Sequence, residues 1–406
     1  MNDALEWACE NAVKGPSAPR WEGIWSRAVS LSPSELDRLD EALRAWPDAM
    51  READETALEG GSPLPELRIA RRLRHRQGPL DGTALHDLLA HPDAARLSSL
   101  ALFSVDTQLS AIEALASDPS GRPQLVELQL ACMPIQDEAS EVLGRSPLAV
   151  RILTFERGAT DRSPATIARG EGLPRLEHLQ YHDVQVGDAG LAAIAASARM
   201  AALSYLRISY SDVGADGARA LAASRAPKLD GLDLRLTRVG EEGMAALAGS
   251  EALRRVSGLH LSEARLGAAG VRALAEHFRG ERLEQLDLAH NRSARRLSPD
   301  WQVGPDACSA LVSARFMQTV RSLDLAGNAL GADGARAVAT SPRLGSLRVL
   351  DLTMNAIGDA GVEALLSSGL VHRLDRLRLQ HDDTIGEEAF DALIDTCEAH
   401  GVELEL

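Results

Sequence analysis

Histidine, aspartate and arginine side chains recur in this chain between regularly spaced leucines, and they are the groups that could do chemistry. His178 and His182 are four residues apart, and His260 follows much later in the chain. Four residues of extended chain span roughly 13 Å, whereas zinc needs its nitrogen ligands at roughly 2 Å. The histidines therefore predict no shared metal ion.

Motifs of known catalytic mechanism are missing from the sequence. It contains no GxxxxGK[S/T] phosphate loop, no GxSxG turn and no HExxH helix. Cys132 would need a paired histidine to act as a nucleophile, and the pattern places none beside it. We therefore expect a protein that is not an enzyme and that needs no cofactor.

Acidic side chains occupy one equivalent position in successive Leu-Asp-Leu segments, at Asp287, Asp324 and Asp351. If these segments form neighbouring strands, like charges about 5 Å apart repel by roughly 0.9 kcal/mol even in water. A cationic partner would relieve that repulsion. The alternative is that aspartate is simply a frequent residue at this position of the repeat.

The elements that must position these side chains are copies of one repeat. The segment VRSLDLAGNALGADGARAVA from Val320 aligns with LRVLDLTMNAIGDAGVEALL from Leu347. Further copies begin at Leu176, Leu203, Leu229, Val256, Leu283 and Leu374, and weaker ones at Leu97, Leu125 and Val150. This gives about eleven units with a period of about 27 residues.

Each unit predicts one short strand followed by one helix. Leucines at every second position give the strand one buried face, and a later apolar pattern with small residues gives a helix. A glycine recurs where the helix begins, which favours an unusual backbone angle or a close approach there. These glycines are Gly187, Gly214, Gly240, Gly267, Gly331, Gly358 and Gly386. One unit cannot bury its own apolar face, so the copies must stack into a solenoid.

The pattern LxxLxLxxN followed by xLGxxGAxALA resembles the ribonuclease-inhibitor-like leucine-rich repeats over roughly residues 97–406. That resemblance implies an α/β, right-handed, horseshoe-shaped solenoid with a parallel sheet on its concave face and helices on its convex face. It also implies an asparagine ladder along the turns, which fits Asn291, Asn328 and Asn355, whereas Thr237 stands at the equivalent place in another unit. The family includes ribonuclease inhibitors, Ran GTPase-activating proteins and the sensor domains of NOD-like receptors.

The two ends and one insertion depart from the repeat. We expect residues 1–80 to form a helical N-terminal cap or a small module with its own partner, with a capping box at Ser32–Glu35 and a helix from Pro33. Residues 81–406 form the predicted solenoid, interrupted by an insertion at 292–303. Val402–Leu406 predicts a last strand.

Composition limits the kinds of partner. The net charge is -16, and dense lysine and arginine would be needed to bind nucleic acid or an anionic membrane. A protein partner with a basic or mixed-charge surface is therefore expected, with the oligomeric state left open. The widely spaced cysteines, the arginine-rich cationic set and the absence of a long apolar run favour a cytoplasmic, bacterial protein.

These observations together predict a non-catalytic protein–protein interaction module: an adaptor, inhibitor or recognition subunit that uses its concave face and rim loops. The alternatives are a GTPase regulator, for which no functional loop can be carried over, and a sensor or structural subunit of a larger assembly. The insertion is expected to be a binding loop, although Trp301 could instead cover its own repeat. The expected partner-binding residues are His178, His182, Tyr205, Arg207, Tyr210, Asp233, Arg235, His260, Glu263, Asp287, His290, Arg292, Arg295, Arg296, Trp301, Asp324, Asp351 and Arg378.

Overall fold

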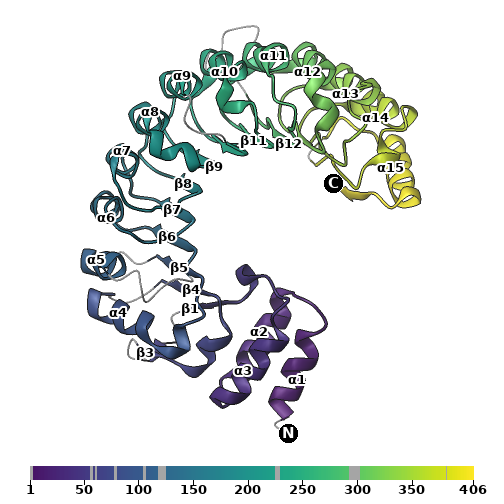
Figure 1. Ribbon diagram of the computed structural model, residues 1–406. Helices are drawn as coiled ribbons and strands as arrows, with labels where there is room; N and C mark the ends of the chain where they lie inside the picture. The colour runs from purple at the N-terminus through teal and green to yellow at the C-terminus, as the bar shows by residue number, and fades with distance from the viewer. Residues whose placement is uncertain are drawn as a thin grey trace. The chain divides into compact units, whose positions relative to one another are not determined.

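The computed structural model describes residues 3–54, 58–59, 62–76, 80–103, 107–117, 125–224, 229–291, 302–380 and 382–406 (Figure 1). The chain divides into two compact units, unit 1 (Met1–Gln180) and unit 2 (Tyr181–Leu406). Each unit is described by itself.

Unit 1 begins with helices and continues with alternating strands and helices. Its helices are α1 (Asp3–Ala12), α2 (Ala18–Ala28), α3 (Pro33–Ala42), α4 (Gly82–Ala90), α5 (Leu109–Ser117), α6 (Gln136–Leu143) and α7 (Arg162–Arg169). Its strands are β1 (Glu52–Asp54), β2 (Leu58–Glu59), β3 (Ser62–Pro63), β4 (Arg72–His75), β5 (Ser99–Leu102), β6 (Glu127–Ala131) and β7 (Ile152–Glu156).

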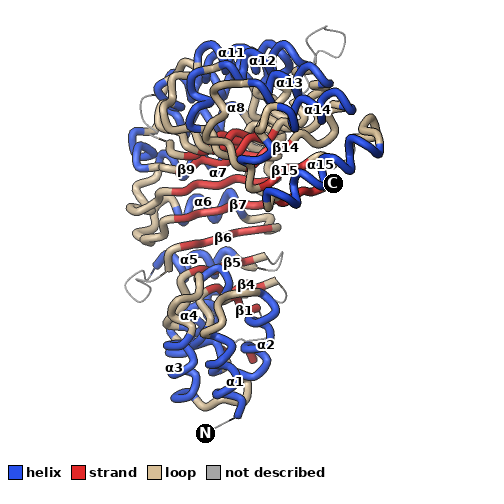
Figure 2. Tube along the Cα trace, turned by 90° about the vertical axis from the view of Figure 1, so that its right-hand side faces the viewer, coloured by secondary structure: helices blue, strands red, loops and turns tan. Residues whose placement is uncertain are grey.

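The repeat strands of unit 1 lie side by side, and β2 and β3 form a separate antiparallel pair. The order β1-β4-β5-β6-β7 is parallel throughout, with Leu73, Leu100, Leu128 and Leu153 in register. Figure 2 shows β4 to β7 as neighbouring strands in chain order. All four leucines are fully buried, so this leucine row forms the inner layer of the unit.

The N-terminal helices have an apolar core of their own. Leu36, Leu39 and Leu43 are fully buried in it. The indole N–H of Trp46 donates to the carbonyl of Ala12 at 2.8 Å, which satisfies a polar group that would otherwise be costly to bury. The predicted capping box is confirmed, because the Ser32 amide donates to Glu35 Oε2 at 2.9 Å.

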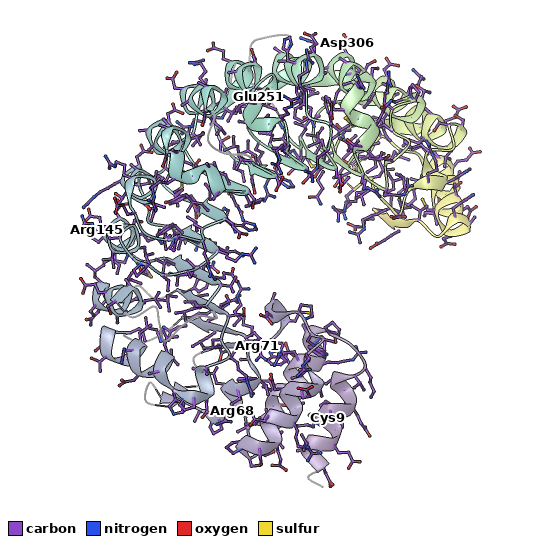
Figure 3. All side chains as sticks on the ribbon, in the orientation of Figure 1. Cys9, Arg68, Arg71, Arg145, Glu251 and Asp306 are labelled. Atoms are coloured by element: carbon purple, nitrogen blue, oxygen red, sulfur yellow. The ribbon has the colours of Figure 1, made fainter. Side chains whose placement is uncertain are left out.

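A network of arginines and aspartates ties α3 to the first strands of unit 1. Arg51, of which only 2% is exposed, contacts Asp40 and donates through Nε to the carbonyl of Ile69 at 2.9 Å. Arg71 Nη2 also reaches Asp40, at 2.7 Å. Arg68 and Arg71 can be located in Figure 3. A single carboxylate therefore compensates two guanidinium groups that are largely removed from water.

We expect Asp40→Asn to lower the free energy of unfolding of unit 1 by about 2 kcal/mol, because it leaves the buried charge of Arg51 without its counter-charge. Urea unfolding followed by tryptophan fluorescence reports on this helical region. Glu41→Gln is the matched control, since Glu41 is 63% exposed in its pair with Arg44 and should change stability by less than about 0.5 kcal/mol. Equal losses for the two variants would contradict the assigned role of Asp40.

Strand β8 (His178–His182) spans the boundary between the units. The remaining strands of unit 2 are β9 (Tyr205–Ser209), β10 (Gly231–Asp233), β11 (Gly258–His260), β12 (Gln285–Asp287), β13 (Ser322–Asp324), β14 (Val349–Asp351), β15 (Arg376–Arg378) and β16 (Glu403–Glu405). Its helices are α8 (Asp188–Ala196), α9 (Ala215–Ala223), α10 (Gly240–Ala248), α11 (Gly267–His277), α12 (Gly304–Ser313), α13 (Gly331–Thr340), α14 (Gly358–Ser367) and α15 (Glu387–His400).

Small residues on the helices of unit 2 bring neighbouring repeats close together. Strands β9 to β16 pair in parallel and in chain order, and Figure 1 shows the helices on the outer side of this sheet. A Cβ added to Gly361 on α14 would lie 3.1 Å from Cβ of Ala335 on α13. Larger side chains at this contact would force the helices apart.

The expected asparagine ladder is present in unit 2. Asn328 donates through Nδ2 to the carbonyls of Leu288 and Leu325, both at 2.9 Å, and its Oδ1 accepts from the amide of Asn291 at 3.0 Å. Asn355 repeats the pattern one unit later. Thr237 keeps one of these bonds, from its hydroxyl to the carbonyl of Leu234 at 2.6 Å.

The recurring glycine at the helix start serves two different geometries. Gly240 and Gly331 have φ of 66° and 59°, in the left-handed region that favours glycine. Gly187 and Gly214, in contrast, have φ of -120° and -119°, so the expectation of an unusual angle is wrong for them. Asp188 Oδ1 there accepts from the amides of Gly214 and Gly217, at 2.7 and 2.8 Å. The acidic residue thus caps the helix of the following repeat.

The predicted fold class is confirmed. Each unit carries parallel strands in chain order, and a helix follows each repeat strand on the other layer. Strands β1 and β4 lie before residue 80, so strand stacking starts inside the segment predicted as a cap or module, whose boundary stays a prediction. Among the described residues, no helix is both long and apolar enough to span a membrane.

Candidate functional site: the strand face of unit 2

One side chain from each strand of unit 2 lies in a single row across the sheet. The pairing registers place Arg207, Asp233, His260, Asp287, Asp324, Asp351, Arg378 and Glu405 on neighbouring strands. We call these residues the central row. Seven of them were expected partner-binding residues, so the structure brings a large part of the predicted set together.

The β9–β10 end of the central row carries two arginines around one carboxylate. Asp233 is fully buried and accepts from Arg235 Nε at 3.0 Å and Nη2 at 2.7 Å, while Arg207 Nε lies 3.4 Å away. The side-chain hydrogen bonds to Asp233 raise the pKa of Arg235. Two guanidinium groups sharing one carboxylate leave this end of the row cationic.

Aromatic and imidazole rings surround this cationic end. Tyr205 covers Gly231, since a Cβ there would lie 2.5 Å from its ring, and burial followed by the charge of Asp233 raises the pKa of its phenol. Nη2 of Arg207 lies 3.1 Å from Nδ1 of His182. Arginine can only donate, so this nitrogen of His182 is the acceptor. The half-exposed Tyr210 ring meets that imidazole edge-on at 6.3 Å.

The β12–β14 part of the central row, called the acidic end below, is followed in the row only by Arg378 and Glu405. Asp287, Asp324 and Asp351 each accept through Oδ1 from the amide two residues later, at 3.1, 3.0 and 2.9 Å. This shared turn holds the three carboxylates in the same orientation. They line a depression of about 180 Å³ together with His260 and Arg378.

Asp324 is the middle carboxylate and the most perturbed. Burial, with the charges of Asp351 and Asp287, raises its pKa to about 7. Among the described residues no cationic group lies within 4 Å of it. Arg378 Nη1 approaches Asp351 at 3.8 Å instead, and its Nε donates to Glu405 at 2.8 Å. Asp324, at the centre of the acidic end, therefore has no ion pair with a described residue.

The remaining histidines and rim residues occupy different surroundings. Burial lowers the pKa of His260, although Asp233 and Asp287 act in the opposite direction. Glu263 and His290 follow their strands in left-handed conformations, both with φ of 53°, and lie beside the central row rather than in it. His178 belongs to unit 1, where burial lowers its pKa.

The expected binding loop cannot be placed. Arg292, Arg295, Arg296 and Trp301 lie outside the described residues, so their role remains a prediction. Glu405 was missed by the sequence reasoning, although alternation along Val402–Leu406 would have put it in line with Arg378.

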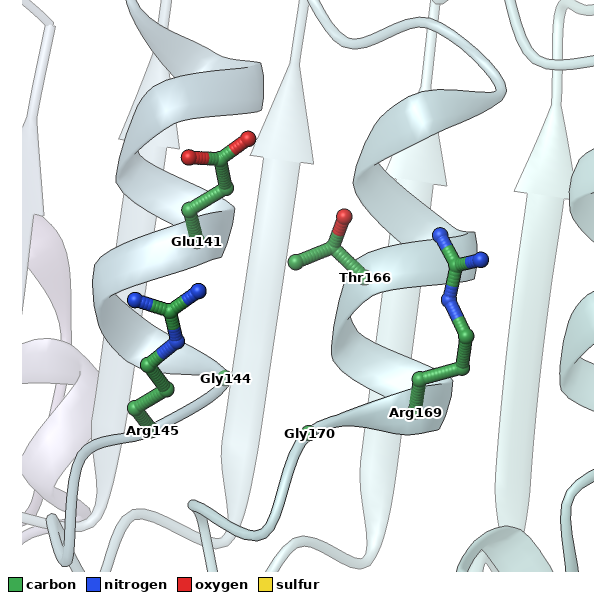
Figure 4. A pocket seen from close by; sticks show the side chains of 6 residues that line it. All are labelled: Glu141, Gly144, Arg145, Thr166, Arg169 and Gly170. Atoms are coloured by element: carbon green, nitrogen blue, oxygen red, sulfur yellow. The ribbon is translucent and has the colours of Figure 1, made fainter.

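A second depression lies on the helical side of unit 1, between α6 and α7 (Figure 4). It measures about 320 Å³ and is lined by Glu141, Arg145, Thr166, Arg169 and two glycines. A Cβ on Gly170 would come within 2.0 Å of the Gly144 carbonyl, so the missing side chains explain both the close approach and the hollow. Its arginines are exposed, which gives it the character of a gap between helices rather than of a built site.

The chemistry available in unit 2 is that of charge recognition. No grouping of three or more histidine, cysteine, aspartate or glutamate residues in the described part of the chain could hold a metal ion. The four cysteines are free, and burial raises the pKa of Cys308 to about 12, which makes that thiol a poor nucleophile at neutral pH. The central row can hold charged groups but offers no activated nucleophile.

Comparison with known proteins supports the repeat architecture. Residues 316–339 and 346–366 match a family model described as a leucine-rich repeat. No curated protein sequence matches the chain. A chain in the crystal structure of the Rad7 and Elc1 complex in yeast is similar, with a TM-score of 0.50 and 14% identity over 95% of this chain and 91% of that chain. At that identity the similarity shows the fold alone. From its repeat strands, its asparagine ladder and these matches, the chain has the fold of a leucine-rich-repeat solenoid.

Proposed function

We propose that this protein is a non-catalytic protein-interaction module that binds a partner through the strand face of unit 2. The observation that carries the proposal is Asp324, a carboxylate with a pKa of about 7 in a lined depression, with no cation within 4 Å among the described residues. A lysine or arginine of a partner would supply that cation. Binding would then favour the ionised form of Asp324, because the cation offsets the repulsion of that carboxylate by Asp287 and Asp351.

The charge of the whole molecule supports a protein partner with a basic or mixed-charge surface. A net charge of -16 opposes the phosphate backbone of nucleic acids and the headgroups of anionic membranes. The yeast structure with a similar fold is a complex of two proteins, which is consistent with this role. We further propose a cytoplasmic, bacterial protein of the ribonuclease-inhibitor-like type that acts as an adaptor, inhibitor or recognition subunit.

The test is affinity purification with the full chain as bait, followed by mass spectrometry and titration of each captured protein. We expect at least one saturable partner, whose affinity falls at least tenfold when Asp287, Asp324 and Asp351 are all changed to asparagine. The matched control is Asp216→Asn combined with Asp333→Asn, because both carboxylates are exposed on helices of unit 2.

Two results would overturn the proposal: no saturable partner, or a partner that binds the triple variant as tightly as the control. A captured GTPase whose hydrolysis rate changes on binding would favour the regulatory alternative.

A further inference from the structure

The central row of unit 2 has opposite charge at two places on one sheet. At β9–β10, Arg207 and Arg235 share Asp233, which leaves an excess of positive charge. The side chain of Arg235 is 36% exposed and that of Arg207 is 26% exposed, while Asp233 beneath them is fully buried. The guanidinium groups therefore face solvent, and their counter-charge does not.

The other place lies three strands further along, at β13. Asp324 is flanked in register by Asp287 and Asp351. The nearest arginine of the row, Arg378, is divided between Asp351 and Glu405. An excess of negative charge therefore remains around Asp324.

We propose that the partner presents an extended segment carrying one acidic and one basic side chain, the acidic group meeting Arg207 and Arg235 and the basic group entering the depression at Asp324. This inference rests on the proposed function and specifies the partner's chemistry. Three strand spacings of about 4.8 Å separate β10 from β13, so the two charges are about 14 Å apart. In extended chain, at about 3.3 Å per residue, that distance corresponds to residues about four apart.

The depression favours an extended segment over a helix. Its volume of about 180 Å³ accommodates a single basic side chain, whereas a helix with its side chains is about 10 Å across. Beside the cationic end, the strand position two residues before His260 is Gly258. This position carries no side chain that would lift a peptide backbone away from the sheet.

The test is selection of random 12-residue peptides displayed on phage, with the full chain immobilised. We expect enriched peptides to carry an aspartate or glutamate and a lysine or arginine about four positions apart. The dissociation constant of a selected synthetic peptide is then measured against the wild type, Asp324→Asn and Arg235→Gln. Asp333→Asn and Arg254→Gln are the controls, since both side chains are exposed and neither residue lies on a strand of unit 2.

The basic peptide residue should interact with Asp324, and the acidic peptide residue should interact with Arg207 and Arg235. Changing the basic peptide residue to glutamine should weaken binding about tenfold on the wild type but less than twofold on Asp324→Asn. Changing the acidic peptide residue to its amide should likewise weaken binding about tenfold on the wild type but less than twofold on Arg235→Gln. If the Arg235 variant does not fold, the Asp324 arm still decides the inference, because asparagine retains the acceptor for the Ala326 amide.

Additive losses in these cycles would overturn the inference, as would enriched peptides without paired charges or the absence of any enrichment. A saturable folded partner captured in the earlier purification would then leave the proposed function standing. The failure of this inference is therefore distinguishable from the failure of the function on which it rests.

Discussion

Asn328→Ala is expected to lower the free energy of unfolding by about 4 kcal/mol. The amide of Asn328 satisfies the carbonyls of Leu288 and Leu325 and the amide of Asn291, and all of these contacts are buried. Alanine leaves the amide of Asn291 without a partner, at about 1–3 kcal/mol. It also removes one of the two donors to each carbonyl, the others being Nδ2 of Asn291 and of Asn355, at about 1 kcal/mol for each lost bond. Urea unfolding measures the loss, and hydrogen exchange should show it concentrated at β12 to β14.

Asn328→Thr is the matched control for the ladder. Thr237 shows that a threonine at this place donates to the carbonyl three residues earlier, so the variant should keep the bond to Leu325 and lose about half as much stability. A loss below about 1 kcal/mol for the alanine variant would show that water or a local shift replaces the ladder.

Asp324→Asn is expected to stabilise the protein, and the gain should depend on pH. The folded-state pKa of Asp324 is about 7, against an ordinary value of 3.8. Between these values the folded state holds a proton that the unfolded state has released, so this group's contribution to stability falls as pH rises from about 4 to about 7. At 1.36 kcal/mol per pKa unit, the penalty at pH 8 is about 4 kcal/mol.

Asparagine removes that penalty, because it stays neutral and can still accept from the Ala326 amide. Thermal unfolding should therefore show a gain of about 4 kcal/mol at pH 8 that shrinks towards zero near pH 4. Asp333→Asn, an exposed carboxylate in the same repeat, should change stability by less than about 0.5 kcal/mol at both pH values. A gain that is equal at pH 4 and pH 8 would contradict the assigned ionisation.

Binding of a cation at Asp324 should have the opposite dependence on pH. A partner's lysine or arginine favours the ionised carboxylate, so affinity should increase as pH rises from 6 to 8. The same residue thus opposes stability and favours recognition at neutral pH.

Local sequence rules predicted the repeat well. Leucines at every second position specify a buried strand face, and small residues specify close helices, so each unit could be read without its neighbours. The capping box at Ser32 followed from local rules as well. The ladder of Asn328 and Asn355 was implied by the resemblance to known repeats, and its bonds lie within one repeat or between adjacent ones.

Features that depend on several repeats at once could not be predicted. Asp233 and Asp324 stand at the same repeat position, yet one is fully buried beneath two arginines and the other is left with a raised pKa. The difference arises from side chains on flanking strands, which no single repeat specifies. Gly214 and Gly240 share a position in the same way and differ in φ: the amide of Gly214 donates to Asp188 Oδ1, whereas the amide of Gly240 donates to the carbonyl of Ala264.

Because the strands of unit 2 keep one register, the order of side chains on its strand face can be changed by adding or removing whole repeats. Asp324 and Asp351 are in register because one full repeat separates them. Excising residues 325–351 would remove one strand, one helix and one carboxylate of the central row while rejoining equivalent points of the repeat. It would make Arg378 the neighbour of Asp324. Loss or duplication of a repeat would therefore change the order of charges along the central row, and with it the choice of partner. The leucine core of each remaining repeat would stay the same.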